Sequence, residues 1–272
     1  MGRRKRPGGL GLALVASLVA LPLLPLLLWA FTGVWRFPDL LPSELSLRGW
    51  EYVAGGGGRA PEAILNSLLI GVAATAASVA VGLPAGMALG GYEFRLKGLV
   101  IFFVLLPILV PPLASTMGIH LTFIRLGLAD TAFGVFLVHL IPTVPYTAII
   151  LTSVFAERGG EMEEAARTLG ASPWQTFRHV TLPRAVPGIA VASLFAFLLS
   201  WSQYALTLLI GGGSVITLPM LLFSAASGSD PVITAVLTVV FALPALLALV
   251  VALRFLRGHG DERDLPFLGR PS

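Results

Sequence analysis

The residue types that most often carry out chemistry in proteins are few in this sequence and stand apart from one another. Cysteine is absent, which excludes a disulfide framework and a thiolate metal site. The four histidines lack the paired spacing of a zinc site; they are His120, His139, His179 and His259. The only lysines, Lys5 and Lys97, follow no glycine-rich phosphate-binding loop. We therefore predict that the chain is not an enzyme, holds no metal or other cofactor, and does not bind ATP through such a loop.

One polar and aromatic cluster interrupts a long apolar segment. It consists of Ser200, Trp201, Ser202, Gln203 and Tyr204. Polar groups in apolar surroundings cost free energy unless they find partners, so such a cluster either contacts a polar solute or joins helices. The pattern favours neither explanation over the other. For His139, in the preceding apolar segment, a hydrogen bond between helices is the better explanation, and a contact with a solute is the alternative.

The longest polar stretch between apolar segments, residues 157–186, predicts two short helices. The first covers Glu161–Leu169, which reads EMEEAARTL and is strongly helix-forming. Three glutamates stand in its first turn, where the helix dipole favours negative charge. Gly170 is expected to end this helix, because glycine readily adopts the left-handed conformation that follows many helices.

The second helix of this stretch begins with a capping box. Ser172 is the N-cap, Pro173 occupies the first helical position and Gln175 the third. We expect this helix to end before the Leu182-Pro183 pair. Two short helices joined at a glycine would form a compact projection.

An aromatic pair lies on one face of the second helix. Trp174 and Phe177 are three residues apart, and such a pair favours a socket in a partner protein. The alternative is an amphipathic helix that lies on the bilayer surface.

The composition places the whole chain in lipid. Of its 272 residues 56% are hydrophobic and only 12% are charged, which is too little polar surface to cover a soluble domain of this size. The net charge of +4 does not indicate nucleic-acid binding, because the basic residues are dispersed between long apolar runs. Membrane lipid is the expected environment.

Six apolar segments are long enough to cross a bilayer, which takes roughly 20 residues of helix. They are residues 10–32, 64–89, 99–118, 131–155, 187–210 and 232–253. None alternates with the period of a barrel strand. We predict an all-α membrane protein with six transmembrane helices, forming one domain over residues 1–272. Prolines mark the third and fourth segments and predict kinks there; they are Pro107, Pro111, Pro112, Pro142 and Pro145.

The distribution of lysine and arginine predicts the orientation. With both termini in the cytoplasm, only Arg36, Arg48, Arg59 and Arg125 of the 18 basic residues face outward. The stretch 157–186 then faces the cytoplasm. A cleaved signal peptide at the basic N-terminus is a weaker reading, because the apolar run exceeds the usual length and no clear cleavage site follows.

The cytoplasmic stretch resembles the EAA signature of type I ABC importer permeases. Glu164, Ala165 and Ala166 are followed at the signature's spacing by Gly170, and further on by Val180 and the Leu182-Pro183 pair. Val180 departs from the pattern by replacing the commoner isoleucine. The resemblance covers spans two to six and is closest to the spermidine and putrescine group.

The resemblance implies a permease subunit whose cytoplasmic loop couples it to a separate ATPase. Glu164 would meet a basic group of the ATPase, Gly170 would permit the elbow, and Ala165 and Ala166 would pack in the cleft of that partner. Trp174, Phe177, Leu182 and Pro183 complete the expected coupling residues. The implied location is the cytoplasmic membrane of a bacterium or archaeon.

The resemblance also implies the partners. They are ABC ATPase subunits that bind ATP and magnesium, a second permease chain and an extracytoplasmic solute-binding protein. The two permease chains would form a heterodimer, with a homodimer as the alternative.

The solute class follows less directly. The run Arg167-Thr168-Leu169-Gly170-Ala171-Ser172 resembles the importers of polyamines, thiamine, iron and oxyanions more than it resembles sugar permeases. The polyamine group usually places acidic residues where Ser202 and Gln203 stand here, so a sugar importer remains the alternative.

Two other classes explain the sequence less well. An ion-coupled secondary transporter would leave the EAA loop unexplained and would find no carboxylate within the spans. An intramembrane serine protease would need a helical Gly-x-Ser-Gly setting, whereas Ser214 falls in a loop and His120 at a helix end.

Overall fold

The computed structural model describes residues 21, 23–36, 39, 41–55, 58–110, 112–156, 160–228 and 230–258, and these are almost entirely helical. They form two compact units. One unit holds the described residues up to Ala60 together with those from Leu222 onward, and the other holds Pro61–Leu221. The larger unit contains every predicted coupling and pathway residue.

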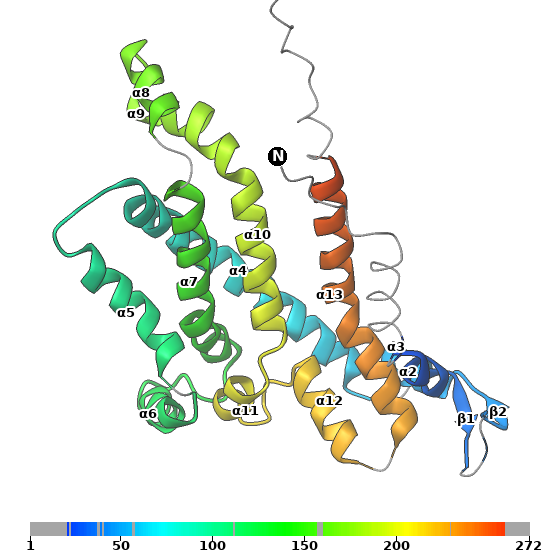
Figure 1. Cartoon of the computed structure of the whole chain (residues 1–272). Helices are drawn as coiled ribbons and strands as arrows, with labels where there is room; N and C mark the ends of the chain where they lie inside the picture. Colours follow the sequence, from blue (N-terminus) through cyan, green and yellow to red (C-terminus); the bar gives the residue numbers. More distant parts are fainter. Residues whose placement is uncertain are drawn as a thin grey trace, which may run out of the picture. The chain divides into compact units, whose positions relative to one another are not determined.

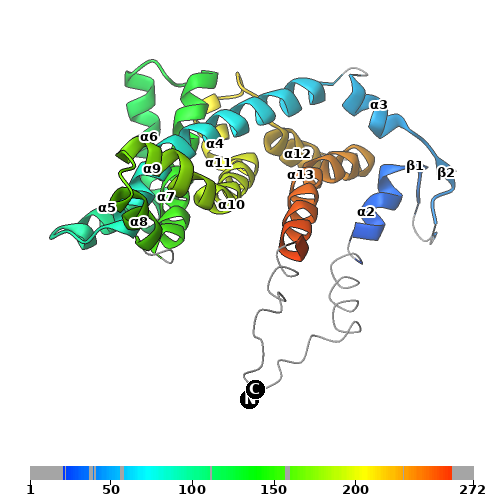
Figure 2. The ribbon, with the colours of Figure 1, turned by 90° about the horizontal axis from the view of Figure 1, so that it is seen from above.

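The larger unit is a bundle of helices (Figures 1 and 2). Its elements are α4 (Ala60–Gly91, from its second residue), α5 (Lys97–Leu109), α6 (Pro112–Arg125), α7 (Ala132–Ala156), α8 (Glu161–Thr168), α9 (Pro173–Thr176), the π-helical turn η1 (Phe177–Thr181), α10 (Leu182–Trp201) and α11 (Ala205–Gly211). In Figure 2, α7 and α10 are seen almost end-on while α4 runs across the view. The helix α12 (Leu218–Ser227) begins in this unit.

Four helices among the described residues are long and apolar enough to cross a membrane. They are Ala60–Gly91, Ala132–Ala156, Pro173–Trp201 and Pro231–Ala248. The second, fourth, fifth and sixth predicted spans each contribute to one of these helices. Of the first predicted span, residues 10–32, the first eleven lie outside the described residues.

The third predicted span, residues 99–118, is divided between two helices rather than forming one. The helix α5 has 13 residues and α6 has 14, so each is short for a membrane crossing. Val110 ends α5 in an extended conformation, with φ −76° and ψ 126°. It precedes proline, and a residue before proline is biased away from the helical region. The sequence predicted a kink at the prolines of this span, and the structure shows a complete interruption of the helix instead.

A seam of glycines on α4 allows it to approach α7 closely. Gly82, Gly86 and Gly90 are spaced four residues apart and share one face of α4. A Cβ atom at Gly86 would lie 2.6 Å from the Cβ of Leu151 and 2.9 Å from that residue's backbone carbonyl carbon. Small residues permit such contacts in membrane bundles, where lipid supplies no hydrophobic drive for helix association. The close approach brings Ser78 of α4 within 2.7 Å of the Thr143 hydroxyl.

An apolar cluster packs α4, α7 and α11 together. Its buried members are Ile70, Val135, Val138, Ile210 and Val215. Two polar side chains of α4 also hold the segment before α12: the Ser67 hydroxyl accepts from the Leu218 amide at 2.8 Å, and the Asn66 amide donates to the Ile216 carbonyl at 2.9 Å. Long-range hydrogen bonds therefore fix this end of the unit.

The smaller unit contains a short antiparallel strand pair and three helices. Its elements are α2 (Leu23–Ala30), β1 (Thr32–Val34), β2 (Glu44–Leu45), α3 (Arg48–Ala54) and α13 (Pro231–Gly258), with the second half of α12. Apolar residues of α2 and α3 pack on Ala235 and Val236 of α13. Asp230 caps α13 and pairs with Arg48 at 3.0 Å.

Candidate functional site

The helix α8 forms as the sequence predicts. It spans Glu161–Thr168 with three glutamates in its first turn and no fully buried residue. Gly170 follows with φ +87°, the left-handed conformation that glycine adopts without the steric cost a Cβ atom brings. The prediction that Gly170 ends this helix and turns the chain is confirmed.

The capping box that begins the second helix is also confirmed. The Ser172 hydroxyl accepts from the Gln175 backbone N–H at 3.3 Å, and Oε1 of Gln175 accepts from the Ser172 N–H at 2.8 Å. Pro173 occupies the first helical position, where its missing N–H costs nothing. The start of α9 is thus specified by local chemistry.

The prediction that this helix ends before Leu182-Pro183 is wrong. The helix passes through η1 directly into α10, so residues 173–201 form one continuous helical rod. In a regular helix the ring of Pro183 would clash with the carbonyl four residues earlier. The π-helical turn, in which the Leu182 N–H bonds to the Phe177 carbonyl, widens the helix at this point and accommodates the proline.

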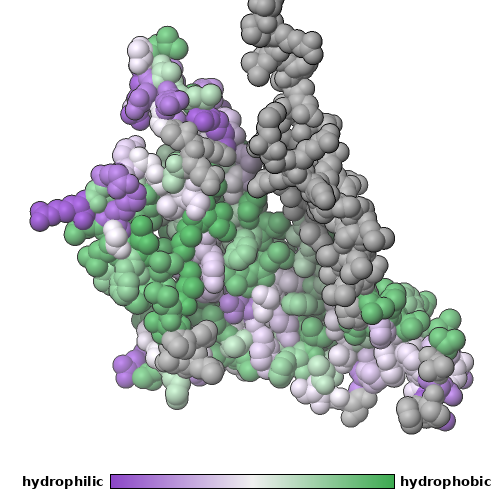
Figure 3. Space-filling view, viewed as in Figure 1, coloured by the Kyte–Doolittle hydropathy of each residue, from purple (hydrophilic) through white to green (hydrophobic). Residues whose placement is uncertain are grey.

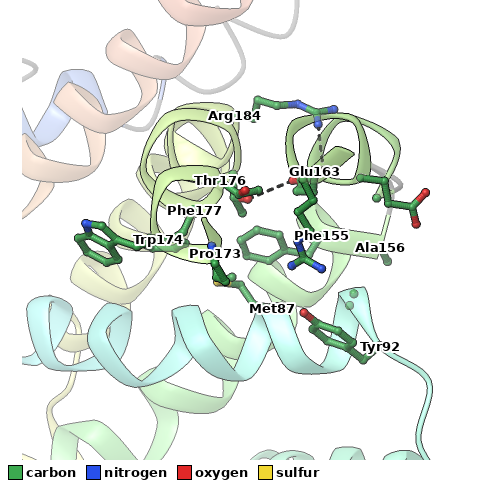
Figure 4. A pocket seen from close by; sticks show the side chains of 16 residues that line it. Met87, Tyr92, Phe155, Ala156, Glu163, Pro173, Trp174, Thr176, Phe177 and Arg184 are labelled. Carbon is green, nitrogen blue, oxygen red and sulfur yellow. Dashed lines mark hydrogen bonds and ion pairs between the residues drawn. The ribbon is translucent and has the colours of Figure 1, made fainter. Parts of the chain in front are cut away.

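The aromatic pair lies on the tip of this rod. The ring centroids of Trp174 and Phe177 are 5.6 Å apart, and Trp174 is 65% exposed. In Figure 4, Trp174 points away from the side chains of α8. Figure 3 shows a largely hydrophilic surface over α8 and α9 and a hydrophobic one over α5 and α7. A large exposed indole in a hydrophilic region is typical of an interaction surface.

Glu163 is a site residue that the sequence reasoning missed. Its Oε1 accepts from the Thr181 hydroxyl at 3.2 Å, and its Oε2 lies 3.6 Å from Nη1 of Arg184 (Figure 4). These contacts tie α8 to the base of α10. The sequence did offer one signal: Glu163 and Ala166 lie three residues apart, so they share one face of α8. The structure half-buries both of them.

A cavity of about 550 Å³ separates α8 and α9 from the ends of α4 and α7. Aromatic side chains line it, among them Tyr92, Phe155 and Phe177, and the ion pair of Glu163 and Arg184 lies in its wall (Figure 4). Its other lining residues are Met87, Gly90, Gly91, Ala156, Gly160, Glu164, Arg167, Pro173, Trp174, Thr176 and Thr181. The cavity therefore lies between the polar stretch of residues 157–186 and two membrane helices, α4 and α7.

The remaining predicted coupling residues lie around these features. Glu164, Ala165 and Pro183 are exposed, while Ala166 and Leu182 are half-buried. Glu164 also lines the cavity. Residues 157–159, at the start of the predicted loop, lie outside the described residues.

The polar cluster of span five does not lie within a continuous helix. The helix α10 ends at Trp201, and α11 starts only at Ala205, so Ser202, Gln203 and Tyr204 form a break. Ser200 is buried and hydrogen-bonded to His139, while Trp201 is buried and stacks on Phe197 with ring centroids 5.7 Å apart. His139 makes the interhelical hydrogen bonds that we expected of it.

The described residues include no group of three or more His, Asp or Glu side chains that could hold a metal ion. His259 lies outside the described part of the chain. No glycine-rich phosphate-binding loop stands in the sequence.

Comparison with known proteins identifies the family. The family model for the binding-protein-dependent transport system inner membrane component matches residues 82–260, which include the whole coupling stretch. The chain belongs to this family. The resemblance to type I ABC importer permeases is thereby confirmed, and the chain is a multi-pass inner-membrane permease subunit of such an importer.

The names of similar permeases give chemically different solutes. A putative 2-aminoethylphosphonate transport permease of Salmonella typhimurium, PhnV, is 28% identical over 89% of this chain and 91% of its own length. The trehalose permease SugB of Mycobacterium tuberculosis is 30% identical over 74% of this chain and 76% of its own. The putrescine permease PotI of Escherichia coli is 29% identical over 68% of each chain.

A solved structure shows the same fold. A chain from the crystal structure of a bacterial ABC transporter involved in the import of the acidic polysaccharide alginate matches with a TM-score of 0.73 and 19% sequence identity. The match covers 90% of this chain and 93% of that chain. The family is one of transport permeases rather than enzymes, and membership implies ATPase and binding-protein partners.

Proposed function

We propose that this permease subunit forms half of a solute pathway and receives mechanical work from a separate ATPase through α8 and α9. The observation that carries the proposal is the continuous helical rod from Pro173 to Trp201, with the exposed Trp174 at its tip. A partner that holds Trp174 can move the rod as a rigid body, so a displacement at the tip reaches Trp201, where the break in span five begins.

The individual coupling residues have distinct proposed roles. Glu164 and Ala165 are exposed and face the ATPase, where the carboxylate meets a basic group. Gly170 sets the angle between α8 and the rod. Phe177 supports Trp174, with ring centroids 5.6 Å apart. Ala166 lies in α8, and Leu182 and Pro183 lie in the rod directly after the π-helical turn.

The charge of the neighbouring helix α8 disfavours the alternative in which the helix with Trp174 and Phe177 lies on the bilayer surface. Surface-lying helices are rich in lysine and arginine, which anionic lipids attract. The helix α8 instead carries three glutamates and one arginine, and Glu161 and Glu164 are exposed. An acidic face suits a basic protein partner better than an anionic membrane surface.

The proposal requires several partners. ATP and magnesium bind to a pair of ATPase subunits, a second permease chain completes the pathway, and an external binding protein delivers the solute. Both termini and the coupling stretch then face the cytoplasm. We favour a heterodimer of permease chains, with a homodimer as the alternative.

We propose a small solute of the oxyanion type, such as a phosphonate. PhnV, whose name gives 2-aminoethylphosphonate as its solute, aligns with this chain over 89% of its residues. In the four long helices only Glu62, in the first turn of α4, carries a carboxylate. The break in span five contains Ser202, Gln203 and Tyr204, all of them uncharged polar residues. Such a lining suits an anionic or zwitterionic solute better than a polyamine dication.

A sugar is the second candidate. SugB, a trehalose permease by name, is 30% identical to this chain. An uncharged polar lining also suits hydroxyl groups. Uptake of 2-aminoethylphosphonate, putrescine and trehalose by the complete importer in liposomes separates the candidates. Transport of putrescine alone would contradict the oxyanion proposal.

A cross-linking experiment tests the coupling role. Because the chain has no cysteine, Trp174→Cys creates a single reactive site. We expect a short thiol-directed cross-linker to join it to the ATPase subunit in native membranes. The control is Met117→Cys in α6, which is 80% exposed and lies in the outward half of its predicted span. Failure of the Trp174→Cys cross-link, or labelling of that cysteine from outside the cell, would overturn the proposal.

A further inference from the structure

A single histidine bridges the break in span five. His139 in α7 places Nδ1 2.8 Å from the hydroxyl of Ser200, in the last turn of α10. Its Nε2 lies 2.8 Å from the hydroxyl of Thr207, in the first turn of α11. The two helical segments on either side of the break are therefore held by the two nitrogens of one imidazole ring.

The direction of these hydrogen bonds follows from Thr207. Its hydroxyl, which has one proton, donates to the Gln203 carbonyl at 2.8 Å. Its oxygen must then accept from Nε2–H, which leaves Nδ1 of His139 to accept from the Ser200 hydroxyl. The chain of bonds runs from Ser200 through His139 and Thr207 to the Gln203 carbonyl. It ends on a backbone group within the break, where an unsatisfied carbonyl would be costly in a membrane.

The turn that carries the imidazole is itself fixed. The Thr143 hydroxyl donates to the His139 carbonyl at 2.8 Å and accepts from the Ser78 hydroxyl of α4 at 2.7 Å. His139, Thr143, Ser200 and Thr207 are all buried, and His139 is only 2% exposed. Fully satisfied buried polar networks specify one arrangement of the groups they join.

The break presents a free polar group. Gln203 is half-buried, and its side-chain amide makes no hydrogen bond to any residue that the structure describes. The neighbouring Ser202 hydroxyl is instead occupied by the Leu199 carbonyl at 3.2 Å. A half-buried amide within a membrane bundle needs a polar partner, and in a transport pathway water or a solute supplies it.

We propose that His139 is a positioning residue that holds the break in span five, so that the Gln203 amide faces the solute. This inference rests on the proposed function, since a fixed break matters only where solute passes. It divides the predicted pathway residues into two groups. His139 and Ser200 use their polar atoms inside the network, while Gln203 remains available for contact.

The absence of cysteine allows a direct test in the assembled importer, with its ATPase and second permease chain. Gln203→Cys is labelled with a charged, water-soluble methanethiosulfonate reagent, and Ser193→Cys in α10 serves as the reference position. We expect Gln203→Cys to react about tenfold faster than Ser193→Cys. Adding Thr207→Val should raise the Gln203→Cys rate about fivefold, the factor expected from losing one internal hydrogen bond. Adding Thr207→Ser, which keeps the hydroxyl, should leave it within about twofold.

Several results would overturn this inference. One is an equal labelling rate for Thr207→Val and Thr207→Ser, and another is a Gln203→Cys that reacts no faster than Ser193→Cys. His139→Leu provides a second variant, and it should match Thr207→Val if the bridge acts as one unit. The Trp174→Cys cross-link is measured in the same membranes. An intact cross-link with unchanged labelling would remove the inference alone, whereas a missing cross-link in the parent chain would remove the proposed function.

Discussion

Glu163 in α8 and Arg184 in α10 form an ion pair across the glycine elbow, with Oε2 of the carboxylate 3.6 Å from Nη1 of the guanidinium. Thr181 adds a hydrogen bond to the other carboxylate oxygen. The chain path from α8 to α10 otherwise runs through Gly170, whose conformational freedom would let α8 swing. These contacts of Glu163 with Arg184 and Thr181, which we call the brace, therefore hold α8 against the helical rod of residues 173–201.

Removal of this brace should weaken coupling. We expect Glu163→Ala to lower the number of solute molecules transported per ATP hydrolysed by about fivefold, the factor expected from one lost hydrogen bond. Basal ATP hydrolysis should persist because the Trp174 surface is untouched. The measurement is parallel uptake and hydrolysis in liposomes containing the complete importer.

Two further variants make the interpretation specific. Glu161→Ala removes an exposed carboxylate from the same turn and should behave like the parent chain. The exchange of Glu163→Arg with Arg184→Glu should recover part of the coupling. Equal coupling in Glu163→Ala and Glu161→Ala would show that the brace has no role.

The glycine seam of α4 predicts a steric effect on stability. Gly86→Ala places a methyl group 2.6 Å from the Leu151 Cβ and 2.9 Å from its backbone, so α4 and α7 must separate. Overpacking of this kind costs about 1–3 kcal/mol. We expect a lower melting temperature in detergent. Gly98→Ala in α5, where a methyl group would meet nothing within 4 Å, is the control. A Gly86→Ala melting temperature equal to that of Gly98→Ala would refute close packing at the seam.

Local signals in the sequence predicted local structure well. The capping box at Ser172 and the stop at Gly170 depend on neighbouring residues only, and both are present as expected. The second, fourth, fifth and sixth apolar runs likewise each contribute to a helix long enough to cross a membrane, because helix length follows from bilayer thickness.

The interruptions of the helices and the long-range contacts were harder to predict from the sequence. Proline signals a disturbance without saying whether the chain breaks, as before α6, or passes through a π-helical turn, as before Pro183. The break after Trp201 contains no proline or glycine. It is bridged by hydrogen bonds from Ser200 and Thr207 to His139, which lies 61 residues earlier than Ser200. The partners of Glu163 were hidden for the same reason, since they lie on a different helix.

The left-handed conformation of Gly170 predicts a graded mutation series. At φ +87° an alanine is strained by roughly 1–2 kcal/mol, whereas asparagine tolerates this region better. We expect Gly170→Ala to reduce coupled uptake and Gly170→Asn to retain more of it. Gly118→Ala, at an open helical position in α6, should have no effect. Uptake that falls equally in the alanine and asparagine variants would indicate that side-chain size, not backbone strain, limits this position.

Asp230 has two separable roles in the smaller unit. Its Oδ1 accepts from the N–H groups of Val232 and Ile233, at 3.1 and 3.3 Å, and thereby caps α13. The same oxygen pairs with Arg48 of α3 at 3.0 Å, but the Arg48 side chain is 55% exposed. An exposed ion pair contributes about 0.2–1 kcal/mol, while loss of an N-cap costs about 0.5–2 kcal/mol.

The two roles predict different effects of two substitutions. Asp230→Asn keeps a capping oxygen and should change the melting temperature little, whereas Asp230→Ala removes both contacts and should lower it clearly. Arg48→Gln removes only the ion pair and should match Asp230→Asn. Thermal unfolding in detergent at low and at high salt distinguishes the contributions, because salt screens the exposed pair but leaves the cap. If Asp230→Asn proved as destabilising as Asp230→Ala, the ion pair rather than the cap would be the main contribution of this residue.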